Sequence, residues 1–93
     1  MVGQESAEAL ALEALAYILA REDLLSSFLA ATGAGGAELR AGAGDPVFLA
    51  AVLDHLLSDD ALVTGFAAEA GLPPLTVVEA RAALPGGQLP NWT

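Results

Sequence analysis

The hydrophobic residues of the chain recur at intervals of three and four, the spacing of one face of an α-helix, and glycine, proline and short polar residues interrupt them. No run of strand length alternates between apolar and polar positions. The pattern predicts helices over residues 7–20, 24–32, 37–42, 46–57, 61–70 and from about 74 to a stop at 85–87. We therefore expect an all-α fold, a compact bundle of five or six short helices. It should form a single domain over residues 1–87, followed by a C-terminal tail over residues 88–93.

Capping signals mark several of the predicted helix ends. The predicted N-caps are Ser6, Asp23, Asp45 and either Ser58 or Asp59. Asp45 is the clearest of them, because Pro46 follows at the first helical position, where a proline costs no hydrogen bond. Gly33 and Gly71 should end the second and fifth helices in the left-handed conformation.

The second half of the chain resembles the first half at an offset of 38 residues. The matched pairs are Leu15 with Leu53, Leu19 with Leu57, Leu24 with Leu62, Phe28 with Phe66, and Gly33 with Gly71. A chain this rich in alanine and leucine produces chance identities, so the matches alone leave coincidence open. The same order of helix, short helix, glycine, loop and short helix in both halves favours a repeat. A true repeat predicts two three-helix units packed face to face about a pseudo-twofold axis.

The first and fourth predicted helices are apolar on more than one face, whereas the second and fifth have a single apolar face. Helices that are apolar nearly all round are usually surrounded, so residues 7–20 and 46–57 should form the centre of the fold. A domain of this size offers few places to bury so many leucines. Either the short helices cover them completely, or an apolar patch remains for a partner.

Composition narrows the range of partners. The chain is 55% hydrophobic and carries 12 acidic residues against three arginines and no lysine, a net charge of −9. This charge repels phosphate groups, so neither nucleic acid nor an anionic membrane surface is expected as a partner. The absence of cysteine excludes disulfides and thiolate chemistry. The N-terminal segment lacks the positive start of a secretory signal and its apolar run is short, so we expect a cytoplasmic protein.

The only histidine, His55, lies next to Asp54 and four residues before Asp59 on the fourth helix. One interpretation is a small-ligand or metal site built from these three residues. A metal site needs three or four converging ligands, and the surrounding sequence supplies no ligand motif. The other interpretation is that Asp54 and His55 form the narrow solvent-exposed face of a central helix. We favour the second, and we expect no metal, no cofactor and no catalytic residues, since no serine lies in a nucleophile elbow and the glycine-rich loop has no lysine.

The three arginines are expected to serve the structure. Arg21, Arg40 and Arg81 lie near the ends of the first, third and sixth helices, where a cation stabilises the helix dipole. Each could also bind a carboxylate such as that of Glu38 or Glu79.

A lone tryptophan, Trp92, lies in the tail with Leu89 and Pro90. It either folds back over exposed leucines, which we favour, or serves as a hook for another protein. The glycosylation pattern at residues 91–93 is set aside, because nothing indicates secretion.

Four segments resemble a known family over nearly the whole chain. They are "AEALALEALAYILA", "LSSFLAATG", "DPVFLAAVLDHLLSDDALVTGFAAEAGLPP" and "ARAALPGG". They are similar to a group of small bacterial proteins, found mainly in alphaproteobacteria, called domain of unknown function 3572. The shared residues are packing and turn residues, so the resemblance implies a family and a bacterial source and transfers no functional residue.

These observations favour a small protein-interaction domain, an adaptor or a self-associating protein, that binds through an apolar helical surface and is not an enzyme. The alternative is a small-ligand or metal-binding protein that uses Asp54, His55 and Asp59. A helix-turn-helix regulator of DNA ranks below both, because its recognition helix would need basic residues that the chain lacks.

Overall fold

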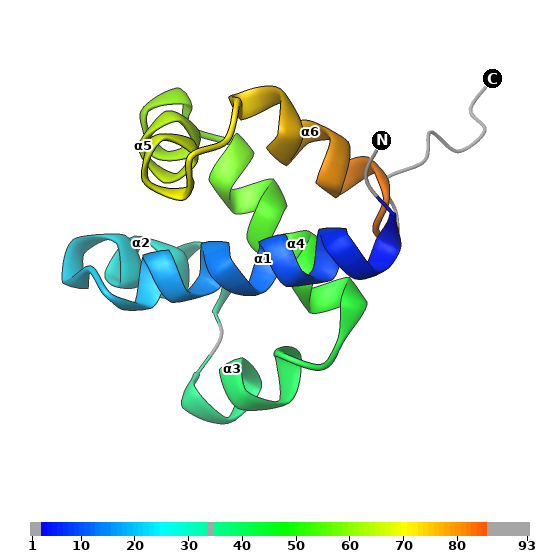
Figure 1. Ribbon diagram of the computed structural model, residues 1–93. Helices are drawn as coiled ribbons and strands as arrows, with labels where there is room; N and C mark the ends of the chain where they lie inside the picture. Colours follow the sequence, from blue (N-terminus) through cyan, green and yellow to red (C-terminus); the bar gives the residue numbers. More distant parts are fainter. Residues whose placement is uncertain (1–2, 34, 86–93) are drawn as a thin grey trace, which may run out of the picture.

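A computed structural model describes residues 3–33 and 35–85, and within these residues the chain forms six α-helices and no strand (Figure 1). The helices are α1 (Gln4–Leu19), α2 (Glu22–Thr32), α3 (Gly36–Gly42), α4 (Pro46–Leu57), α5 (Asp60–Ala70) and α6 (Pro74–Ala82). The predicted all-α class is confirmed, and every predicted helix is present. The predicted C-terminal tail, including Trp92, lies outside the described residues.

The predicted centre of the fold is where α1 and α4 pack against each other, with α1 lying across α4 (Figure 1). The main contacts of α4 extend to α1, α3, α5 and α6, whereas those of α1 are with α2, α4 and α6. The largest fully buried side chains are Phe28, Ile18, Leu49, Leu53, Leu56, Leu84, Val52 and Val77. Half of them come from α4. The fourth helix is therefore the more completely enclosed of the two central helices.

Two of the predicted N-caps are confirmed. The Asp45 carboxylate accepts a hydrogen bond from the Val47 amide (3.0 Å), and Pro46 is the first residue of α4. Asp59, rather than Ser58, caps α5: its Oδ1 accepts from the amides of residues 61 and 62 at 2.9 and 3.4 Å. Ser58 belongs to the end of α4, where its hydroxyl donates to the His55 carbonyl (2.6 Å).

The other two predicted N-caps are wrong, because both helices begin earlier. The N-cap of α1 is Gly3, so Ser6 lies inside the first turn. The N-cap of α2 is Arg21, and Asp23 lies in the first turn beside Glu22. Both carboxylates stabilise the helix there, because they lie near the positive end of its dipole. In both places the helix continues toward the N-terminus past the residue that could have capped it.

Both predicted glycine termini are confirmed. Gly33 ends α2 with φ of 71°, and Gly71 ends α5 with φ of 73°. Glycine has no Cβ, so it adopts this left-handed conformation without a steric penalty, and the chain can leave each helix in a tight turn.

The two halves of the chain share their first two helices more closely than their third. Phe28 and Phe66, a matched pair of the repeat, are both buried on the second helix of their half. The pair formed by Leu19 and Leu57 differs, since Leu19 is exposed and Leu57 is half-buried. The third helices of the two halves differ in their packing. The main contact of α3 is with α4, whereas α6 packs on α1, α4 and α5. Any pseudo-twofold relation therefore applies to α1–α2 and α4–α5 and is broken by α3 and α6.

In the described part of the chain, no single helix has both the length and the apolar character needed to cross a membrane. The successive helices α5 and α6 reach that length only when joined, and they are bent by 102° where they meet.

Candidate functional site

The three residues of the proposed metal or ligand site do not converge. Asp54 faces α6, where it forms a two-pronged ion pair with Arg81: Nε donates to Oδ1 (2.6 Å) and Nη2 donates to Oδ2 (3.1 Å). Arg81 also donates to the carbonyl of Pro85 (3.1 Å). The expectation that Arg81 binds a carboxylate is confirmed, but its partner is Asp54 on α4 rather than Glu79 on its own helix. This ion pair joins the central helix to the last helix and draws Asp54 away from His55.

His55 and Asp59 do line one cavity, of about 410 Å³, between α1, α2, α4 and α5. Its lining residues are Tyr17, Leu24, Ser27, His55, Ser58, Asp59, Ala61 and Leu62. The His55 ring meets the Phe28 ring edge to face, with the ring centres 5.2 Å apart. The Asp59 carboxylate is engaged in capping α5. Among the described residues, no three histidine or carboxylate side chains come close enough together to hold a metal ion, so the three-residue metal arrangement is wrong.

A second feature is the outward face of α1, which carries apolar side chains that none of the other described helices covers. Four exposed residues follow one another at intervals of three, four and three: Ala9, Leu12, Ala16 and Leu19. We call these four residues the outward stripe. Leu12 is 41% exposed and Leu19 is 43% exposed, whereas the opposite face of the same helix is buried in the core. Two apolar side chains per seven residues is the pattern with which one helix packs against another.

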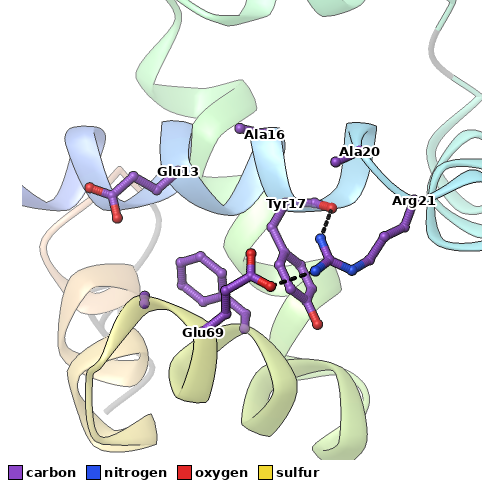
Figure 2. Close-up of a pocket in the computed structure, with 8 residues that line it drawn as sticks. Glu13, Ala16, Tyr17, Ala20, Arg21 and Glu69 are labelled. Atoms are coloured by element: carbon purple, nitrogen blue, oxygen red, sulfur yellow. Dashed lines mark hydrogen bonds and ion pairs between the residues drawn. The ribbon is translucent and has the colours of Figure 1, made fainter.

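A groove lies between α1 and α5, and Figure 2 shows the residues that line it. It has a volume of about 320 Å³ and is lined by Glu13, Ala16, Tyr17, Ala20, Arg21, Phe66, Glu69 and Ala70. Ala16 belongs to both the stripe and the groove. The three alanines leave room for a side chain from outside, and the two aromatic rings, which meet edge to face at 5.5 Å, form a rigid apolar wall.

Arg21 holds one end of this groove in place. Its guanidinium lies 3.9 Å from the centre of the Tyr17 ring and donates to the Tyr17 carbonyl (3.0 Å). It also pairs with Glu69 of α5 (2.5 Å), as Figure 2 shows. The predicted role of Arg21 at the end of the first helix is confirmed, because it satisfies a carbonyl of the last turn of α1. The link to α5 was not foreseen from the sequence.

Among the described residues, α4 and α6 also carry exposed large apolar side chains, one on α4 and two on α6, as many on α6 as on α1. Val47 on α4 is 63% exposed beside a cavity of about 380 Å³ that lies between the end of α2, α3 and the start of α4. Leu75 and Val78 on α6 are 63% and 48% exposed, on a helix of nine residues. The outward stripe is longer, since it runs over most of the 16 residues of α1 and adjoins a groove.

Comparison with known proteins identifies the family of this chain. Residues 4–87 match the family described as "Protein of unknown function (DUF3572)". No curated protein and no solved structure gives a significant match.

Proposed function

We propose that this chain, which belongs to the family of domain of unknown function 3572, acts by binding a protein, either another chain or a second copy of itself, through the outward face of α1. The single observation behind this proposal is the outward stripe, which leaves leucines at the spacing of a helix–helix contact open to solvent. Exposed apolar side chains that follow one another on one helix face are candidates for contact with a partner, because contiguous exposed apolar patches mark interaction sites.

The two faces of α1 differ in burial, and this difference supports the proposed role. Its inward face supplies Leu15 and Ile18 to the core, 5% and 0% exposed. Folding therefore accounts for the apolar residues of that face. It does not account for Leu12 and Leu19, and a contact with a partner would bury both.

Affinity capture from the native cell, compared between two variants, tests the proposal. Leu12→Glu with Leu19→Glu places charges on the outward stripe, and the matched control, Val47→Glu with Leu75→Glu, places the same charges on other exposed apolar positions. We expect specific partners, or a dimer if light scattering detects one for the unmodified chain, to be lost from the stripe variant and kept by the control. Equal loss from both variants, or no loss from either, would count against the outward face of α1.

A second candidate function is binding of a small ligand in the cavity beside His55, favoured by the presence of an imidazole, a carboxylate and hydroxyl groups around one space. Asp54 has no part in it. The His55 ring resonances, followed by NMR during addition of divalent metals and small polar metabolites, test this role. Resonances that never move would remove it.

The proposed role requires no chemical transformation, so we infer a binding protein rather than an enzyme. We also place it in the cytoplasm, a location that fractionation of the native cell would check.

A further inference from the structure

The outward stripe is bordered by glutamates on both sides. Glu8, just before the first stripe residue, lies along one edge, and Glu13, just after the second, lies along the other. Glu5 lies in the first turn of the same helix. No lysine or arginine occurs anywhere in α1. A helix that packs on the stripe would therefore have its own flanking positions next to carboxylates.

A second copy of α1 is a poor occupant of this surface. In a parallel pairing of two helices, the position before one stripe residue lies beside the position after the next stripe residue of the other helix, so Glu8, before Ala9, would face Glu13, after Leu12, of the second copy. In an antiparallel pairing, the flanking positions again offer only glutamates or uncharged residues, because α1 has no basic residue. Like charges at these positions destabilise the pairing, and a net charge of −9 on each copy adds to the repulsion.

We propose that the occupant is an amphipathic α-helix of another protein, with apolar residues at intervals of three and four and with lysine or arginine on both flanks. This rests on the proposed function and specifies its partner. The apolar residues of such a helix cover the outward stripe, and its basic residues lie beside Glu8 and Glu13.

The groove between α1 and α5 gives this contact a direction. The glutamates of α1 lie in its first ten residues, whereas Leu19, Ala20 and the groove lie toward its C-terminal end. The basic part of the partner helix therefore aligns with the start of α1. Its largest apolar side chain enters the groove, where Ala16, Ala20 and Ala70 leave space beside the Phe66 ring.

Two synthetic peptides of equal length, composed for helix formation, test this inference. Both carry leucine at the same three-and-four spacing, one with lysine at the flanking positions and the other with glutamate. A third peptide has the composition of the lysine peptide in scrambled order, so that it is basic without an apolar face. Binding of each fluorescently labelled peptide to the full chain is measured by anisotropy at low and at moderate salt.

We expect the lysine-flanked peptide alone to bind, with an affinity that falls as salt rises. Glu8→Gln with Glu13→Gln should weaken it about fivefold to twentyfold, the size of two exposed charge pairs. Glu22→Gln with Glu79→Gln, which removes the same charge elsewhere, should leave it nearly unchanged. Leu12→Glu with Leu19→Glu should weaken it roughly a hundredfold or more, because two leucines lose their burial.

The inference is overturned if the glutamate peptide binds as well as the lysine peptide, if the scrambled peptide binds equally, or if the two glutamine variants behave alike. Absence of peptide binding together with a dimer that the stripe variant abolishes would overturn the basic partner and leave the proposed function standing. Absence of binding together with captured partners that the stripe variant retains would remove both.

Discussion

Leucines at positions 12 and 15 lie on the same helix, one turn apart, yet the structure assigns them to different roles. Leu15 is 5% exposed and belongs to the core cluster, whereas Leu12 is 41% exposed on the outward stripe. Replacing each of them by alanine in turn therefore separates the folding face of α1 from the proposed binding face. The intrinsic helix preference changes equally in the two variants, so it cancels in the comparison.

The expected magnitudes follow from burial. A leucine-to-alanine change removes three carbon atoms beyond Cβ, worth about 0.8 kcal/mol each when buried, or about 2.4 kcal/mol in transfer free energy. At Leu15 the closed surroundings add the cost of a cavity, so we expect unfolding to become easier by about 2.5–4 kcal/mol. At Leu12 water fills the vacated space, and the partial burial corresponds to about 1 kcal/mol or less.

Urea denaturation followed by far-UV circular dichroism measures both free energies of unfolding, and the denaturant dependence should be the same for the two variants. A marginally stable domain of this size could unfold outright with the Leu15 change, in which case Leu15→Val gives the same ordering with a smaller loss. A loss at Leu12 as large as that at Leu15 would refute the reasoning, since it would show that the outward stripe is part of the folded core.

Three further predictions address particular contacts. Asp59→Ala should cost about 1 kcal/mol in the free energy of unfolding, because two amides at the start of α5 lose their acceptor; a change near zero would contradict the capping role. Gly42→Ala should cost about 1–3 kcal/mol, because a Cβ there would overlap the Phe48 ring where α3 meets α4, and a stabilising effect would show that α3 can move away freely. A double-mutant cycle on Asp54 and Arg81 should give a coupling energy of about 0.5–1 kcal/mol that shrinks with added salt; no measurable coupling would show that the pair is incidental.

Sequence patterns predicted the elements of this fold well because glycine, proline and aspartate act locally. Asp45 followed by proline, and Gly33 and Gly71 at helix ends, impose their conformations whatever packs around them. The failures at Ser6 and Asp23 have a different cause. A polar residue that can cap a helix is equally acceptable inside a first turn, so the actual start depends on how far the chain before it continues the helix.

The candidate sites depended on tertiary placement, which local patterns do not contain. Asp54 and His55 are neighbours in sequence, but the side chain of Asp54 is drawn to Arg81, which is 27 residues away. The apolar excess of the first helix was visible in the sequence, together with the possibility of a partner. The leucines that remain outside could be identified only once α2, α4 and α6 had covered the other face of α1. The three-four-three spacing of the outward stripe was the available signal.

The central claim, that the outward face of α1 is the binding surface, is tested most directly by mapping a bound helix on the protein itself. Backbone amide shifts of the isotopically labelled full chain are followed by NMR as the lysine-flanked peptide is added. The account predicts that the largest shifts fall along α1 from Ala9 to Leu19 and on the edge of α5 that borders the groove. Shifts concentrated around His55, or on α6 near Leu75, would contradict it.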